Sequence, residues 1–125
     1  MKLLTHTIGH RDERGEIFDL PFIGDISAIN YITFSNSSIR GNHYHKKTIQ
    51  WNYLIEGKLT VAIRNKQNET HNLIINAGQL LLIEENESHA FKAEEFSRMM
   101  VFTMGPRAGK EYESDTYRLT EPLIK

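Results

Sequence analysis

The segment from Arg40 to Lys47, which reads Arg-Gly-Asn-His-Tyr-His-Lys-Lys, is the most informative stretch of this sequence. Residues 39–45 are predicted to be extended, and residues at positions i and i+2 of a strand point to the same face. The imidazoles of His43 and His45 would then lie on one face, about 6–7 Å apart at the backbone. Both could bind one divalent ion at about 2 Å. Tyr44 points to the opposite face, which predicts a packing role.

Further residues follow this histidine pair in an ordered series. Gln50 and then Gly57 come soon after it. Much later Gly78 precedes the apolar run of residues 80–83, and His89 lies eleven residues beyond Gly78.

The remainder of the chain predicts short strands with turn signals about every 8–12 residues, which is typical of a sandwich or a barrel. The clearest expected hairpin joins residues 50–55 to residues 59–64 through a turn in which Gly57 supplies a positive φ. The uniformly apolar run 80–83 predicts a strand buried on both faces. The other expected strands are an N-terminal one, one around Phe91, and residues 17–20, 26–34, 39–45, 70–75 and 99–104. A closed barrel would leave none of these strands with an exposed edge.

Length and composition predict one domain spanning residues 1–125. The chain has 125 residues, of which 39% are hydrophobic and 25% charged, enough for a single core. It has no cysteine, which excludes disulfides and thiolate chemistry. The net charge of −1 gives no general attraction to nucleic acid or anionic lipid. No apolar run approaches the roughly 20 residues that span a bilayer, and charges at residues 11–14 come too early for a signal peptide. We expect a soluble, cytoplasmic protein without nucleic-acid or membrane partners.

The spacing of these glycines and histidines resembles the two motifs of the cupin superfamily, here at about residues 41–57 and 78–91. The resemblance extends over roughly residues 25–104. It implies an all-β fold, a single cupin (jelly-roll-like) antiparallel β-barrel with the histidines facing its interior. It also implies a divalent transition metal, namely zinc, iron or nickel. The implied metal ligands are His43, His45, Gln50 and His89.

The sequence departs from the cupin pattern at two positions. Gln50 stands where a glutamate ligand is usual, and Glu84 stands where a proline is usual. A neutral Gln50 would leave more positive charge on a bound ion and favour an anionic ligand. Two alternatives remain open: the histidines line a pocket without metal and act as acid and base, or they are purely structural.

Residues 40–47 also resemble the Arg-Gly-x-His-x-His segment of small cupins from sugar-nucleotide and capsular polysaccharide pathways. Two such groups are the sugar 3,4-ketoisomerases and the metal-binding cupin domain at the end of capsular polysaccharide reductases. This resemblance implies a small-molecule substrate, a nucleotide-linked sugar, and isomerase or epimerase chemistry beside a carbonyl. His43 and His45 are the predicted acid and base because imidazole titrates near neutral pH. Arg40, or the metal, would stabilise the oxyanion, although Arg40 also has an interpretation as a surface ion pair. The segment 112–118 departs from the ketoisomerase pattern.

Two other functional classes compete with this one. A three-histidine site with iron or nickel would suit a dioxygenase, and a barrel without turnover would suit a small-ligand-binding module. The resemblance to small cupins further implies a homodimer, paired through sheet faces and exchanged terminal strands.

Several cations and histidines outside the motifs have a solvated surface position as the preferred interpretation. The cations, which would otherwise hold a substrate phosphate or carboxylate, are Arg107, Lys110 and Arg118. The histidines are His6, His10 and His71.

Four aromatic residues have core packing as the preferred interpretation. Trp51 and Phe91 have the alternative of an apolar pocket wall. Tyr31 and Tyr53 have the alternative of proton donors.

Overall fold

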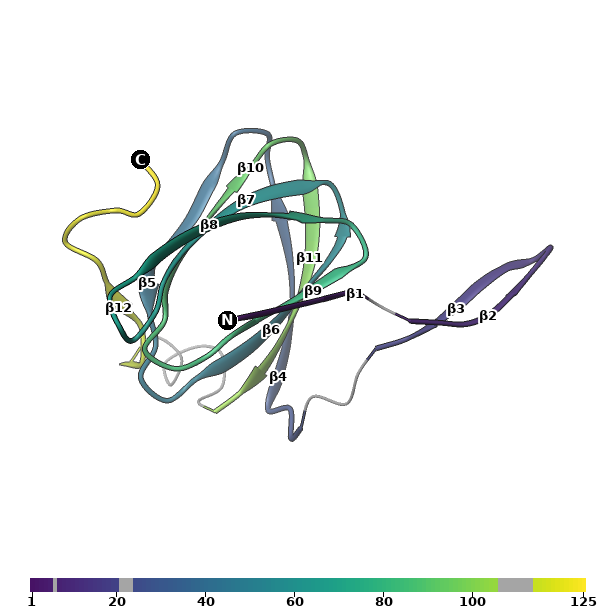
Figure 1. Cartoon of the computed structure of the whole chain (residues 1–125), viewed down its shortest axis with the longest axis horizontal. Coiled ribbons are helices and arrows are strands. Elements are labelled where there is room, and N and C mark those ends of the chain that lie inside the picture. Colours follow the sequence, from purple (N-terminus) through teal and green to yellow (C-terminus); the bar gives the residue numbers. More distant parts are fainter. Residues whose placement is uncertain (6, 21–23, 106–113) are drawn as a thin grey trace.

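The structure, a computed structural model, describes residues 1–5, 7–20, 24–105 and 114–125. Within these residues the chain forms twelve strands joined mostly by short turns (Figure 1). They are β1 (Lys2–Thr5), β2 (Thr7–Asp12), β3 (Gly15–Asp19), β4 (Ala28–Phe34), β5 (Ile39–Tyr44), β6 (Ile49–Glu56), β7 (Lys58–Arg64), β8 (Thr70–Asn76), β9 (Gln79–Ile83), β10 (Ser88–Ala93), β11 (Ser97–Met104) and β12 (Tyr117–Arg118).

Two five-stranded antiparallel sheets make the barrel. Their strand orders are β1-β9-β6-β11-β4 and β12-β5-β10-β7-β8. Residues of β11 alternate between buried and partly exposed along its whole length, because successive side chains of a strand point to opposite faces and one face is turned to the interior. The architecture confirms the predicted all-β jelly-roll barrel.

The expected hairpin between residues 50–55 and 59–64 is wrong. Strand β6 pairs with β9 and β11, whereas β7 pairs with β8 and β10. The turn at Gly57 therefore carries the chain from one sheet to the other. Gly57 does have a positive φ of 98°, and a Cβ there would lie 2.6 Å from the carbonyl oxygen of Phe96. Apolar alternation is a local pattern, so it does not distinguish a hairpin from such a corner.

The apolar run 80–83 forms most of β9, which lies between β1 and β6. Leu80, Leu81 and Ile83 are buried, and Leu82 is partly exposed. The expectation of a strand buried on both faces is thus confirmed for three of its four apolar residues.

The buried residues that share one face of β6 change from polar to apolar along the strand. On β6 the alternating residues Gln50, Asn52 and Leu54 share one face, and all three are buried. The first two are polar, and Leu54 belongs to the apolar core. That core is a cluster of buried residues from both sheets, comprising Phe34, Leu54, Leu59, Val61, Ile63, Ile75, Leu81, Ile83, Phe91, Ala93, Met99 and Val101.

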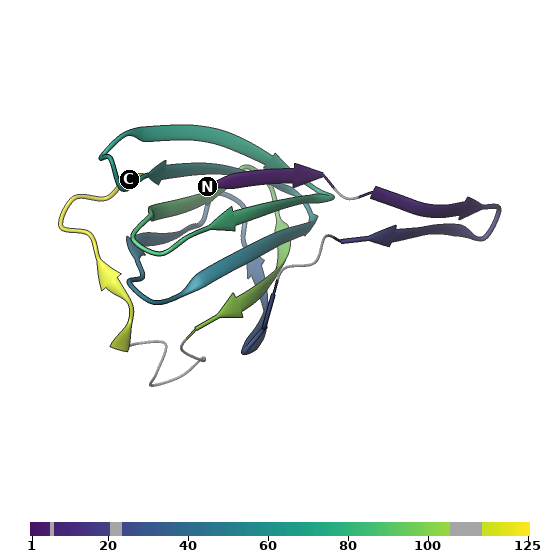
Figure 2. The same ribbon diagram turned by 60° about the horizontal axis from the view of Figure 1, so that its bottom comes forward.

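Strands β2 and β3 pair only with each other among the described strands, as a hairpin that extends away from the barrel (Figures 1 and 2). We call residues 7–19 the arm. Ile17 and Phe18 of the arm are 62% and 41% exposed. In the part of the chain that the structure describes, no helix has the length and apolar character to cross a membrane.

Candidate functional site

Three histidines meet inside the barrel. His43 lies on β5 directly opposite His89 on β10, and His45 follows at the end of β5. Their ring centroids are separated by 4.7 Å (His43–His89), 4.9 Å (His43–His45) and 5.5 Å (His45–His89). One nitrogen from each ring lies within 4.8 Å of the others. The structure thus places all three predicted histidines together, facing the interior.

Gly41 allows β5 and β10 to bring the histidines together. The pairing of β5 with β10 is irregular between His89 and Ala90, opposite Gly41. A Cβ at Gly41 would lie 2.8 Å from the carbonyl oxygen of His89 and 3.2 Å from Cα of Ala90. Gly41 also has a φ of 94°, a backbone conformation that residues with a Cβ rarely adopt. A larger residue would therefore push β5 away from β10 at the site.

Hydrogen bonds define the protonated nitrogen of two of the rings. Nδ1 of His45 lies 3.0 Å from the backbone carbonyl oxygen of Asp115, and Nδ1 of His89 lies 3.0 Å from that of Glu87. A carbonyl oxygen only accepts, so each Nδ1 must carry the proton and each neutral ring keeps its lone pair on Nε2. The buried Nδ1 of His43 has no hydrogen-bond partner among the described residues.

Burial keeps these rings neutral. Desolvation, together with smaller effects of the nearby His45 and Arg118, lowers the pKa of His43 to about 4. Desolvation likewise lowers the pKa of His89 to about 3, with a smaller effect of His43 in the same direction. The pKa of His45 is also lowered by burial. Neutral imidazoles are the form that accepts a proton or binds a metal.

A cavity of about 410 Å³ opens onto this cluster. His43 and His89 line it, whereas His45 lies outside the lining. The side-chain amides of Gln50 and Asn52 also reach it. Apolar walls come from both sheets, among them Ile32, Phe34, Phe91, Met99 and Val101. Among the described residues the charged ones that line the cavity are two arginines, Arg40 and Arg118, and no carboxylate does.

Arg40 lies at the cavity as part of β5. Its guanidinium lies over the ring of Phe34, 5.5 Å from the centroid, and donates to the carbonyl oxygen of Thr33 at 3.2 Å. Arg118 lies on β12, which pairs with β5 so that Arg118 is opposite His43. The sequence-based preference for a solvated Arg118 is therefore incomplete, because this exposed side chain also borders the cavity.

The aromatic residues singled out in the sequence differ in whether they line the cavity. Phe91 lines the cavity and also belongs to the core, as both of its interpretations required. Trp51 is buried but does not line this cavity, although the residues before and after it in the chain, Gln50 and Asn52, do. Tyr31 is exposed and, like Tyr53, is not part of the lining. Tyr44 stacks on Tyr117 with 5.3 Å between the ring centroids, which confirms its packing role.

The surface histidines behave as expected where they are described. His71 is exposed, and His10 is exposed and lies 3.0 Å from a carboxylate oxygen of Asp12. His6, Arg107 and Lys110 lie outside the described residues.

Sequence reasoning missed Asn52 and Asp115 as residues of the site. Asn52 could have been found, because it lies two residues after Gln50 on the same face of a strand. Asp115 could not, since it contacts His45 from 70 positions further along the chain. No local pattern marks a contact of that separation.

The described strands form the jelly-roll barrel expected of a cupin-like fold, with the three histidines in its interior. This fold is shared by a 3,4-ketoisomerase from Helicobacter canadensis, with a TM-score of 0.78, 21% identity, and coverage of 94% of this chain and 90% of that one. The WlaRB TDP-quinovose 3,4-ketoisomerase from Campylobacter jejuni gives a TM-score of 0.77, 21% identity, and coverage of 94% and 92%. The rmlC epimerase from Mycobacterium tuberculosis gives 0.76, 16% identity, and coverage of 94% and 67%.

The family can also be stated. The model of the polysaccharide biosynthesis C-terminal domain family matches residues 10–117, and this chain belongs to that family. No curated protein matches the sequence.

Proposed function

We propose that this chain is an isomerase or epimerase that moves a proton next to the carbonyl of a nucleotide-linked keto sugar. The observation that carries the proposal is the neutral His43 at the wall of a cavity whose described charges are two arginines. Such a cavity favours an anionic substrate, because each arginine can pair with a phosphate oxygen. The folds it shares with sugar 3,4-ketoisomerases and an epimerase support the same class of reaction.

The proposed reaction begins when His43 takes a proton from the carbon next to the sugar carbonyl. The electron pair of the broken C–H bond forms the enediolate, and the negative charge moves to the carbonyl oxygen. Arg40, which lines the cavity, supplies the positive charge that stabilises that oxygen. In a ketoisomerisation His43 gives the proton to the former carbonyl carbon, and the hydroxyl proton of the deprotonated carbon passes to the former carbonyl oxygen. In an epimerisation a solvent proton adds to the opposite face of the deprotonated carbon, the carbonyl re-forms, and His43 releases its proton to solvent.

A bound anion would also make His43 a better base. The free cavity holds its pKa at about 4, below the range in which a general base is most effective at neutral pH. A phosphate or developing enediolate beside the imidazole adds negative charge, which raises the pKa of that imidazole. We therefore expect proton transfer only with an anionic sugar bound.

Solvent deuterium exchange into TDP-4-keto-6-deoxyglucose tests this proposal. We expect the chain to catalyse exchange at a carbon next to the carbonyl, and the His43→Asn variant to lose it by about 10³-fold. His71→Asn, which changes an exposed histidine outside the cavity, is the matched control. No exchange with the wild type, or equal exchange with His43→Asn, would overturn the assignment of His43 as the base.

The histidine cluster also supports a second candidate function, the binding of a divalent transition metal. Its residues fit such an ion, because Nδ1 of His45 and Nδ1 of His89 both donate to backbone carbonyls, as metal-binding histidines do. His43, His45 and His89 would hold zinc, iron or nickel, with Gln50 as the fourth ligand. The bound ion would act as a Lewis acid toward a substrate oxygen.

Elemental analysis of tag-free protein, beside a His43→Ala/His45→Ala variant, tests metal binding. We expect nearly one metal ion per chain, lost in the variant. Absence of metal from the wild type after reconstitution would contradict it. The two functions compete for His43, since one lone pair cannot both bind a metal and accept a proton. Oxygen uptake by the loaded protein would favour the dioxygenase instead.

The predicted homodimer remains a proposal that the arm supports. A two-stranded hairpin is marginally stable alone, yet the arm extends from the barrel (Figure 2). Its residues Ile17 and Phe18 are exposed. A second copy of the chain would cover these side chains. Sedimentation is expected to give a dimer for the wild type and a monomer for Ile17→Ser/Phe18→Ser. A monomeric wild type would contradict the dimer.

A further inference from the structure

Two of the site histidines are held by buried acidic residues in the same manner. The carbonyl oxygens of Asp115 and Glu87 accept from Nδ1 of His45 and His89 respectively. Each of these acidic residues is only 4% exposed. Buried carboxylates are costly unless they are hydrogen-bonded, so the partners of the two side chains indicate what they do.

The carboxylate of Asp115 fixes the turn that follows His45. It accepts from the backbone amides of Lys46 and Lys47 at 3.1 and 3.0 Å, and from the hydroxyl of Thr48 at 2.7 Å. The backbone carbonyl oxygen of the same residue accepts the hydrogen bond from Nδ1 of His45. Asp115 thus links the C-terminal segment to both the ring and the turn after it.

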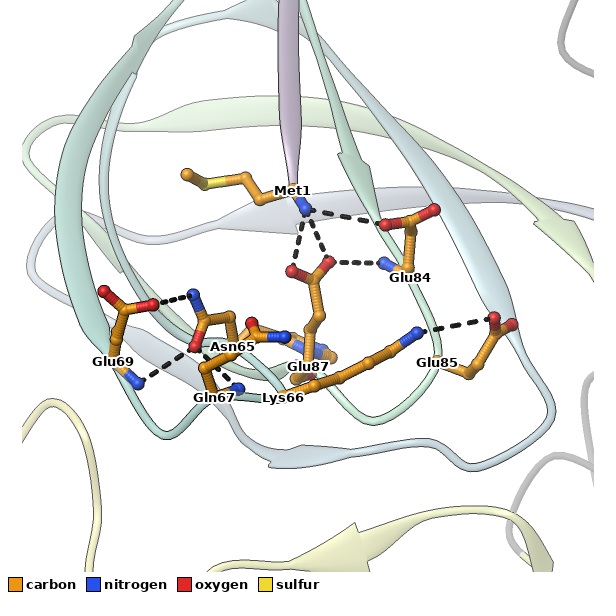
Figure 3. Close-up of polar contacts among 9 residues, drawn as sticks. Met1, Asn65, Lys66, Gln67, Glu69, Glu84, Glu85 and Glu87 are labelled. Atoms are coloured by element: carbon orange, nitrogen blue, oxygen red, sulfur yellow. Dashed lines mark hydrogen bonds and ion pairs between the residues drawn. The ribbon is translucent and has the colours of Figure 1, made fainter.

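The carboxylate of Glu87 fixes the turn that precedes His89 (Figure 3). It accepts from the backbone amide of Glu84 at 2.8 Å and from the Met1 ammonium group at 2.9 and 2.7 Å. The side chain therefore ties together the turn and the start of β1. The carbonyl that meets Nδ1 of His89 belongs to this anchored residue.

We propose that Asp115 and Glu87 are a pair of positioning residues for the histidine cluster. Each carboxylate anchors one peptide, and the carbonyl of that peptide holds one imidazole with its proton on Nδ1. Both rings then present the lone pair of Nε2 in a fixed direction. His43 is the histidine of the same site that lacks this arrangement, because its Nδ1 has no hydrogen-bond partner among the described residues.

Fixed tautomers serve either chemistry of the site. A ring that flips or exchanges its proton between nitrogens presents an acceptor for only part of the time, which weakens metal binding. It also disturbs the proposed base, because the ring centroid of His43 lies 4.9 Å from that of His45 and 4.7 Å from that of His89. The consequence for catalysis rests on the proposed function, whereas the positioning itself does not.

Long-range ¹H–¹⁵N NMR of the imidazoles in the full-length chain tests the positioning. The wild type is expected to give the pattern of a single Nδ1–H tautomer for both His45 and His89, assigned with the His45→Ala and His89→Ala variants. Asp115→Ala is expected to convert His45 to a tautomer mixture and leave His89 unchanged. Glu87→Ala is expected to do the reverse, so each variant is the matched control of the other.

Three milder variants keep the test decisive if the alanine variants unfold. Asp115→Asn and Glu87→Gln keep one acceptor oxygen each, and Thr48→Val removes one hydrogen bond of Asp115. We expect partial tautomer mixing at His45 for the changes at Asp115 and Thr48, and at His89 for the change at Glu87. Folded variants with unchanged tautomers, or with equal changes at both rings, would overturn the proposal.

Deuterium exchange separates this proposal from the proposed function. We expect Asp115→Asn to lower kcat for exchange by about 10–100-fold while KM stays near the wild-type value. A wild type without exchange activity would remove the proposed reaction but not the positioning, which the NMR patterns decide alone. An unchanged kcat together with mixed tautomers at His45 would overturn the catalytic consequence of the positioning.

Discussion

The two ends of the barrel interior are built from the same strands and have opposite chemistry. At one end β6 and β10 contribute Gln50, Asn52 and His89, all buried polar residues. At the other end the same strands contribute Leu54 and Ala93, which belong to the apolar core. Burial of the apolar side chains stabilises the fold, whereas burial of the polar ones costs free energy unless they are hydrogen-bonded. The difference indicates that one end supplies stability and the other supplies function.

The largest expected effect tests the apolar end. Leu54 is fully buried in the core, so Leu54→Ala removes apolar contacts and leaves a cavity. We expect the free energy of unfolding in urea to fall by about 2–5 kcal/mol, while exchange activity per folded molecule is retained. Ile55→Ala, at the exposed neighbouring position, is the control. A loss of activity without a loss of stability would break the division between the two ends.

The second prediction concerns the cost of neutral histidines at the polar end. The pKa of His89 is about 3 in the folded chain and about 6.5 in the unfolded chain. The unfolded chain therefore binds the proton first as pH falls, and stability present above pH 6.5 is lost between that pH and about 3. Each pH unit in this window costs about 1.4 kcal/mol per such histidine.

Urea unfolding at pH 6.5 and pH 5, with a chelator present, measures this cost. His89→Asn is expected to reduce the loss by roughly 2 kcal/mol. His71→Asn, at an exposed position, is the matched control. An equal loss in His89→Asn and the wild type would show that the polar end does not carry this penalty.

The sequence predicted the buried apolar strand and the meeting of the three histidines better than it predicted the contacts that hold these histidines in place. The apolar run of residues 80–83 and the spacing of His43 and His45 are local patterns, and such patterns follow from the geometry of a strand. The contact between Asp115 and His45, and the pairing of Arg118 with His43, depend on segments brought together only by folding. The turn at Gly57 shows the same limit, because its residues do not reveal which sheet the next strand joins.

The third prediction concerns charge at the cavity. Arg118 is exposed but borders the site, so Arg118→Ala should weaken substrate binding without removing core packing. We expect KM for exchange to rise about tenfold, which corresponds to 1.4 kcal/mol, with the melting temperature unchanged. Arg64→Ala is the control, since Arg64 is outside the cavity lining. An unchanged KM would mean that Arg118 does not contact the substrate.

The smallest expected effect is also the sharpest test of the comparison. Asn52 is buried and donates to the carbonyl oxygens of Leu81 at 3.1 Å and Gln50 at 3.3 Å. Asn52→Leu exchanges a polar group for an apolar one of similar size, so lost hydrogen bonds and gained apolar burial nearly cancel. We expect the free energy of unfolding to rise by up to about 1 kcal/mol, and exchange activity to fall. This pairing of greater stability with lower activity is expected where a polar residue is kept for function. A loss of stability above about 2 kcal/mol would instead show that the polar end supports the barrel, and the division between the two ends would fail at Asn52.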